Sequence, residues 1–101
     1  MSEITAMLGL CKKAGRLSAG FEAAKASIME KSAKVVFAAS DLSAKTYKEL
    51  CFYAKGQIPV RRLAEDIDEI SGSIGQRAGC VSVNDEGFAE KMLLMTGGKC
   101  L

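Results

Sequence analysis

One short apolar run constrains the fold of this chain more than any other stretch. Residues 33–40, AKVVFAAS, place β-branched and aromatic side chains next to one another without the alternation of a half-exposed strand. A continuous apolar run of this length between polar flanks predicts a strand that is covered on both faces. The chain therefore needs helices on either side of a sheet.

Helical patterns precede and follow this strand. Residues 2–13 carry apolar side chains at the i, i+3, i+4, i+7 spacing of one helix face, with Ser2 as a start and Gly15 as a stop. Further helices are expected over residues 20–31, 43–54 and 63–70, and from Asp85 through Leu93 with Asp85 as the cap. The side chains expected on the buried faces of the second and third helices are Phe21, Ala24, Ile28, Tyr47, Leu50, Cys51 and Ala54.

Short strands are expected between these helices. Residues 16–18 allow a small strand, residues 57–60 (QIPV) a second and residues 80–84 (CVSVN) a third. Pro59 lacks an N–H donor, which places its strand at an edge. Helices alternating with strands predict an α/β fold, with helices on both faces of a roughly four-stranded sheet. We expect one domain over residues 1–101, with Gly97 and Gly98 ending the last helix and a frayed tail from about residue 97.

Composition describes an ordinary globular chain and narrows the choice of partners only slightly. Hydrophobic residues make up 49% of the 101 residues and charged residues 26%, while the net charge is +2. This balance is typical of globular proteins, not of disordered ones. A nucleic-acid partner would therefore need a local basic patch.

The cysteines predict neither a metal site nor a disulfide framework. The four cysteines include no C-x-x-C pair, and the chain has no histidine, so a zinc site is not expected. No signal peptide or membrane-spanning apolar run is visible. We expect a cytoplasmic protein with reduced thiols and no membrane partner.

Enzymatic chemistry finds no support in the sequence. There is no histidine base and no G-x-S-x-G elbow, and the glycine-rich residues 72–79 match neither nucleotide-binding pattern. Residues 65–69, EDIDE, are expected to form a solvated face of a short helix. Cys80 near Arg77 suggests a lowered thiol pKa, but no partner base is visible. We expect a protein without catalytic residues, cofactor or metal.

The start of the second helix has two interpretations. In the simpler one, Glu22 complements the helix dipole and forms an i, i+3 surface pair with Lys25. In the functional one, free backbone N–H groups near Gly20 hold a phosphate while Glu22 and Lys25 address guanine edges. Phe21 is then either a core residue or an apolar floor beside that surface.

Two other stretches also allow both a structural and a functional interpretation. Lys12, Lys13 and Arg16 either complement the end of the first helix or form a basic rim for a phosphate backbone. The stretch before the last strand is either a helix stop or a loop that presents backbone and small side chains to an unpaired base. The residues of that loop are Arg77, Ala78, Gly79 and Cys80.

Five stretches together resemble a ribosomal protein family. They are MLGLCKKAGRLSAG at residues 7–20, AKVVFAASDLSAKTYKEL at 33–50, IPV at 58–60, GSIG at 72–75 and DEGFAEKM at 85–92. They lie in the order seen in the family of archaeal ribosomal protein L-seven-Ae, eukaryotic L-thirty-e and their bacterial relatives. The chain is similar in particular to the small bacterial YlxQ-type members.

This resemblance implies a fold and a ligand. The implied fold is a three-layer α-β-α sandwich with a mixed four-stranded sheet. The implied activity is non-enzymatic binding of kink-turn RNA, a sharply bent helix–internal loop–helix with tandem sheared G·A pairs. Family members read those guanines with a pattern close to N-E-x-x-K, which falls on Phe21, Glu22 and Lys25 here, and they pack the loop corresponding to residues 77–80 on a flipped-out nucleotide.

The asparagine of that pattern is absent, which leaves a second hypothesis open. A phenyl ring neither donates to nor accepts from a base edge. The chain is therefore expected either to bind structured RNA, ribosomal RNA included, or to be a ribosome-associated protein–protein adaptor that kept the fold. The adaptor would expose Phe21 as an apolar anchor.

Overall fold

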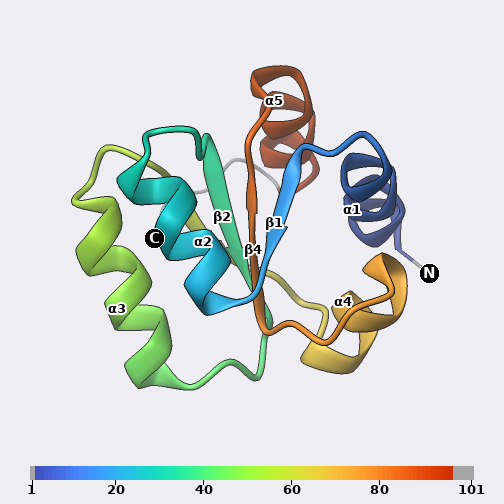
Figure 1. Cartoon of the computed structure of the whole chain (residues 1–101). Helices are drawn as coiled ribbons and strands as arrows, with labels where there is room; N and C mark the ends of the chain where they lie inside the picture. The colour runs from blue at the N-terminus through green and yellow to red at the C-terminus, as the bar shows by residue number, and fades with distance from the viewer. Residues whose placement is uncertain (1, 97–101) are drawn as a thin grey trace.

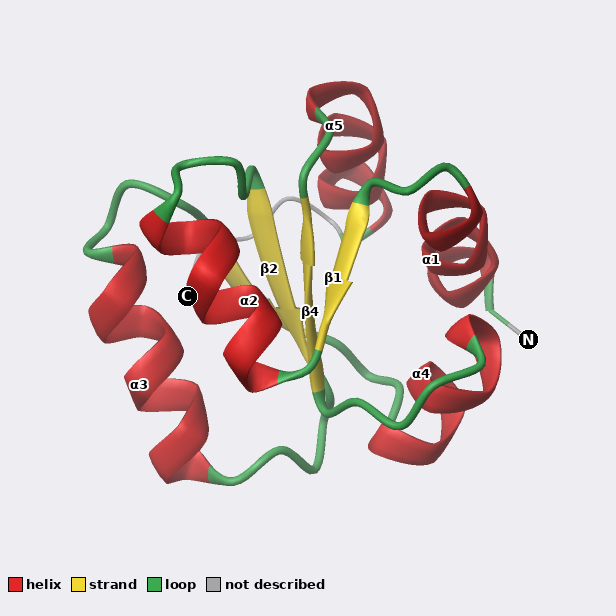
Figure 2. Ribbon diagram, viewed as in Figure 1, coloured by secondary structure: helices red, strands yellow, loops and turns green. Residues whose placement is uncertain are grey.

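A mixed four-stranded sheet forms the middle layer of the protein, as the computed structural model of residues 2–96 shows (Figures 1 and 2). The strand order is β1-β4-β2-β3, with β4 antiparallel to both β1 and β2, and β3 parallel to β2. The elements in chain order are α1 (Glu3–Lys13), β1 (Leu17–Ala19), α2 (Phe21–Met29), β2 (Val35–Ala38), α3 (Ala44–Ala54), β3 (Val60–Arg62), α4 (Ile67–Ile74), β4 (Cys80–Val83) and α5 (Glu86–Met95).

Helices cover both faces of the sheet, which confirms the predicted α-β-α sandwich. On one side α2 and α3 lie next to each other, and on the other side lie α1, α4 and α5 (Figure 2). Successive residues of β2 point into opposite layers: Phe37 packs in the larger cluster with α1, α4 and α5, whereas Val36 packs with α2 and α3. All four residues of β2 are buried, as the apolar run at residues 33–40 predicts.

Most predicted helix starts are confirmed by their caps. The side-chain oxygens of Ser2, Ser43 and Asp85 accept hydrogen bonds from backbone N–H groups three residues ahead, at the starts of α1, α3 and α5. These bonds satisfy donors that have no partner inside the helix. The predicted end of α5 at Gly97 and Gly98, the frayed tail and Cys100 lie outside the described residues.

The predicted fourth helix over residues 63–70 is displaced by about one turn. The structure begins α4 at Ile67, because Asp66 and Glu69 form a reciprocal capping box with N–H···O distances of 2.8 and 3.1 Å. Leu63 instead continues the edge of the sheet, where its N–H donates to the carbonyl of Ala38 at 2.7 Å. Two carboxylates of the EDIDE stretch therefore start a helix, where only a solvated face was predicted.

Two smaller expectations also need correction. Cys51 is exposed, because Leu50 and Ala54 define the buried stripe of α3 and Cys51 lies outside it. The edge strand runs over residues 60–62 and not 57–60, since pairing can only start after Pro59, which accepts from Val36 at 2.9 Å but has no N–H to donate. The predicted edge position of this strand is confirmed.

A buried polar network fastens α2 to the sheet. The hydroxyls of Ser18 on β1 and Ser27 on α2 lie 2.7 Å apart, and the side-chain amide of Asn84 donates to both, at 2.9 and 3.4 Å. Ser82 on β4 donates to the Asn84 side-chain oxygen at 3.0 Å. Three elements are therefore joined by side-chain hydrogen bonds inside an otherwise apolar layer.

Removal of the Ser27 hydroxyl is expected to destabilise the fold. Ser27→Ala removes the bonds of this buried hydroxyl to Ser18 and to the Asn84 amide and leaves only the bond between those two residues, which should lower the free energy of unfolding by about 1–2 kcal/mol. Urea denaturation followed by circular dichroism measures this. Ser73→Ala is the matched control, since its hydroxyl bonds to the carbonyl of Ile70 in its own helix; an equal loss in both variants would contradict a role for the network.

Candidate nucleic-acid interface

The start of α2 lies directly beside the loop that leads into β4. Ala19 pairs with Val81 at the end of β1, and the N–H of Gly20 donates to the carbonyl of Cys80 at 2.8 Å. Because β1 and β4 are antiparallel, the chain leaves β1 where it enters β4. Two stretches about 60 residues apart in sequence, each singled out as a possible RNA contact, are thus brought together at one end of the sheet (Figure 1).

The first turn of α2 is open to a ligand. Gly20 is the N-cap with a φ of 94°, a left-handed conformation that favours glycine, and no side chain among the described residues caps the helix. The backbone N–H groups of the first turn therefore have no intrahelical acceptor and point toward the end of the helix. Glu22 is exposed in the same turn.

Lys25 is held by an aromatic ring of the neighbouring helix. Its ammonium group lies 4.8 Å from the centre of the Tyr53 ring on α3, a cation–π distance. The ion pairs of the described residues do not include one between Glu22 and Lys25. This arrangement disfavours the simpler interpretation of the two as a surface pair and leaves the Glu22 carboxylate available to other donors.

Phe21 packs against the same tyrosine. The two rings are edge to face with centres 6.5 Å apart, and Phe21 is half-buried beside the cluster between α2, α3 and the sheet. The residue therefore serves partly as core, which agrees with one of its two predicted roles. It is not the exposed anchor that the adaptor hypothesis expects.

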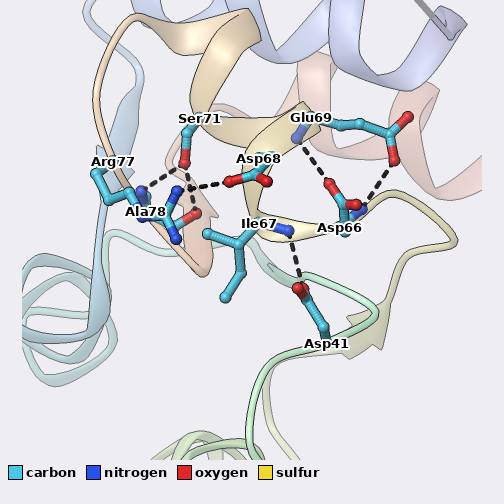
Figure 3. Close-up of polar contacts among 8 residues, drawn as sticks. All are labelled: Asp41, Asp66, Ile67, Asp68, Glu69, Ser71, Arg77 and Ala78. Atoms are coloured by element: carbon cyan, nitrogen blue, oxygen red, sulfur yellow. Dashed lines mark hydrogen bonds and ion pairs between the residues drawn. The ribbon is translucent and has the colours of Figure 1, made fainter.

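The loop at residues 77–80 is tied to α4 (Figure 3). The guanidinium of Arg77 contacts the carboxylate of Asp68 at 2.6 Å, and both side chains are exposed. The N–H of Ala78 donates to the hydroxyl of Ser71 at 3.0 Å, and that hydroxyl lies 3.4 Å from the carbonyl of Ala78. The loop therefore has a fixed backbone, whereas its exposed ion pair is weak enough to exchange for a phosphate.

The expectation that small side chains of this loop face a ligand is wrong for two of its residues. Ala78 packs into the larger core cluster, and Cys80 is only 1% exposed in the layer between the sheet and α2. A Cβ added to Gly79 would lie 2.8 Å from a methyl group of Leu42, so this backbone also packs closely against its neighbour. The accessible surface of the loop is the exposed Arg77 and the half-buried Gly79.

Burial also reverses the expected acidity of Cys80. Desolvation raises the pKa of its thiol to about 11, where the sequence suggested a lowered pKa. Burial likewise raises the pKa of Cys11 to about 11, with a smaller contribution from the Asp85 carboxylate. Both thiols are therefore protonated at neutral pH. Cys80 acts as a small apolar group, whereas the Cys11 thiol donates to the carbonyl of Arg16 at 3.2 Å.

The basic residues at and after the end of α1 lie in different places. The ammonium of Lys12 donates to the side-chain oxygen of Gln76 at 2.5 Å and so joins the loop that enters β4. The carbonyl of Arg16 accepts from Asn84 at the opposite end of β4. Since β1 separates Arg16 from Gly20 by roughly 13 Å of extended chain, Arg16 does not lie at the start of α2. Lys13 is exposed in the last turn of α1.

Tyr53 and Gln76 belong to this surface although no pattern in the sequence singles them out. Tyr53 contacts Phe21 and Lys25 only because α2 and α3 pack side by side, and Gln76 meets Lys12 across 64 positions of sequence. A tyrosine in the last turn of a helix is too common to signal a site. Within residues 2–96, no helix is long and apolar enough to cross a membrane, and no group of acidic, cysteine or histidine side chains is arranged to hold a metal ion.

Comparison with known proteins identifies the fold and the family. No protein-family model matches the chain. A protein of unknown function from Bacillus halodurans superposes with a TM-score of 0.89 at 24% identity, covering 96% of this chain and 99% of that one. The Giardia lamblia 15.5kD RNA binding protein superposes with a TM-score of 0.78 at 10% identity, covering 97% and 88%. These likenesses show that the fold is the α-β-α sandwich of the L-thirty-e type.

A protein related in sequence identifies the family in addition to the fold. The RNA-binding protein YlxQ of Enterococcus faecium is 34% identical over 89 residues, covering 84% of this chain and 82% of that protein. The chain therefore belongs to the ribosomal protein L-seven-Ae and L-thirty-e family, and within it to the small bacterial YlxQ-type members. The resemblance noted from five short stretches is thus confirmed.

The burial of two thiols predicts a pattern of chemical modification. At pH 8 iodoacetamide should alkylate Cys51 in the folded protein but leave Cys11 and Cys80 unmodified, because the first is exposed and the other two are buried with raised pKa values. Peptide mass spectrometry measures the modification at each site, with the urea-unfolded protein as the control in which all three react. Fast alkylation of Cys80 in the folded protein would show that its side chain reaches the surface.

Proposed function

We propose that this chain is a non-enzymatic, cytoplasmic RNA-binding protein that recognises a kink-turn through the start of α2 and the loop at residues 77–80. The observation that carries the proposal is the hydrogen bond from Gly20 to Cys80, which places these two stretches beside each other. The naming of the Enterococcus faecium relative as an RNA-binding protein supports the same class of ligand. Ribosomal RNA is one source of such a structure.

In this proposal the first turn of α2 reads guanine. The Glu22 carboxylate accepts hydrogen bonds from the ring N–H and amino group of one guanine, and Lys25 donates to O6 or N7 at another edge. The free N–H groups after Gly20 bind a phosphate of the same strand. A sheared G·A pair leaves guanine edges accessible in a way that a Watson–Crick pair does not, which gives this turn its selectivity.

The basic residues attract the phosphate groups of the RNA electrostatically. Lys12 extends the phosphate contacts beside the loop before β4, whereas Lys13 at the end of α1 and Arg16 before β1 attract the phosphates of a flanking stem. Arg77 can exchange Asp68 for a phosphate, since the pair is exposed. Beside Arg77, the half-buried Gly79 faces an extruded nucleotide. By binding only the bent form, the protein shifts the equilibrium of the RNA toward it.

Phe21 sets the strength of this interaction. The asparagine of the family pattern would add a hydrogen bond to a base edge, and the half-buried phenyl ring cannot. A lost base contact costs about 1–3 kcal/mol, so we expect affinity about 10- to 100-fold below that of a chain with the complete pattern. The adaptor hypothesis loses support, because Phe21 packs against Tyr53 and is not an exposed anchor.

Loss of the Glu22 carboxylate should weaken binding to the bent RNA selectively. Glu22→Ala is expected to reduce affinity for a fluorescently labelled kink-turn RNA by about 10- to 100-fold, through the lost contact with guanine. Fluorescence anisotropy measures the Kd. The comparison RNA has Watson–Crick pairs in place of the tandem G·A pairs, and its affinity should be weak and unaffected.

The matched control variant is Glu86→Ala. Glu86 lies in the first turn of α5, so its removal changes net charge and helix dipole in the same way as that of Glu22. It belongs to the other helical layer and should leave RNA affinity unchanged. Equal affinity of the wild-type protein for the two RNAs would refute kink-turn recognition, and equal losses in the two variants would refute the role of Glu22.

A further inference from the structure

The outer face of α3 carries an exposed aromatic ring among charged side chains. Lys45, Lys48, Glu49 and Phe52 follow the i, i+3, i+4, i+7 spacing of one helix face. Phe52 is 68% exposed, an unusual position for a phenyl group. With Tyr53 these residues line an open hollow of about 430 Å³. We call these five residues the α3 face.

The α3 face is continuous with the start of α2. The rings of Phe52 and Tyr53 are edge to face, with centres 5.4 Å apart and an angle of 78° between planes. Tyr53 in turn contacts Phe21 and Lys25 of α2. The tyrosine therefore joins two groups of similar chemistry, each with a phenyl ring, a carboxylate and at least one lysine ammonium group.

We infer that an unpaired nucleotide of the bound RNA stacks on Phe52, with its flanking phosphates on Lys45 and Lys48. This inference rests on the proposed function and extends its interface from α2 across Tyr53 to α3. The exposed ring of Phe52 offers a π-surface on which any base can stack. Glu49 would repel a phosphate, so we place it at the base edge, where it accepts from an exocyclic amino group.

The charges favour a nucleotide over an apolar protein surface. Lysines are depleted in protein–protein interfaces, where docking on Phe52 would remove water from the neighbouring ammonium groups without supplying anions. A phosphodiester backbone supplies an anion at every nucleotide and leaves the ring for a base. The combination of lysines with an exposed ring therefore fits single-stranded RNA.

Phe52→Ala tests the stacking contact. The variant should bind a labelled kink-turn RNA about 10-fold more weakly than the wild-type protein, as expected for loss of base–aromatic stacking. Phe52→Tyr should keep the affinity, because it retains the ring. The comparison RNA has the same sequence with its unpaired nucleotides made abasic, and on this RNA Phe52→Ala and the wild-type protein should bind equally.

Matched controls separate this contact from general surface effects. Leu94→Ala removes another exposed apolar side chain, 78% exposed on α5 in the other helical layer, and should not change affinity. Exchange of Lys45 and Lys48 for glutamine should lower the slope of log Kd against log salt by roughly 1.4, about 0.7 for each contact with single-stranded phosphate. Lys91→Gln on α5 is the charge control.

The outcomes distinguish this inference from the proposed function. Unchanged affinity of Phe52→Ala beside weakened binding by Glu22→Ala would overturn the stacking contact, keep the proposed function and leave a protein surface as the occupant of the α3 face. An equal loss on the abasic RNA would also overturn it. Failure of the wild-type protein to prefer the bent RNA would overturn both.

Discussion

The antiparallel pairing of β1 with β4 is the interaction on which the candidate interface depends. β1 has only three residues, yet its register with β4 decides which loop meets the start of α2. A slip of one residue would reverse the faces of Leu17, Ser18 and Ala19 and break the hydrogen bond between Gly20 and Cys80. The register of one short edge strand therefore decides that the start of α2 and the loop at residues 77–80, far apart in sequence, lie on a common surface.

Tyr53 gives this surface its second organising contact. In a chain with asparagine at position 21, the first residue of α2 would be free to address a base. Here the phenyl ring of Phe21 turns to Tyr53, and Lys25 lies over the same ring. The residue that departs from the family pattern thus takes part in the packing of α2 against α3, and this packing joins the first turn of α2 to the α3 face.

Much of the architecture can be predicted from the sequence, because each local signal agrees with its long-range environment. The apolar run at residues 33–40 demands cover on both faces, and the caps at Ser2, Ser43 and Asp85 mark helix starts. The fourth helix begins later than predicted because Asp66 and Glu69 form a capping box, and the pattern D-x-x-E by itself fits a solvated charged face equally well.

The site was less predictable, since its properties arise between elements. The side chains of Ala78 and Cys80 looked available in a glycine-rich loop, but the strand that follows carries them into the core. Arg16 is four residues from Gly20 in sequence and at the opposite end of β1 in space. Tyr53 becomes part of the surface only through helix packing. Burial and contacts of this kind follow from tertiary structure and leave no local pattern.

The polar network of Ser18, Ser27, Ser82 and Asn84 bears on which partner, protein or RNA, changes conformation on binding. Hydrogen bonds have direction, so α2 cannot rotate about its axis or slide along the sheet without breaking them. The helix that presents Glu22 is therefore preorganised, and little ordering entropy is lost on the protein side. On the proposed function, the conformational change falls to the RNA, and the association rate follows the fraction of RNA that is already bent.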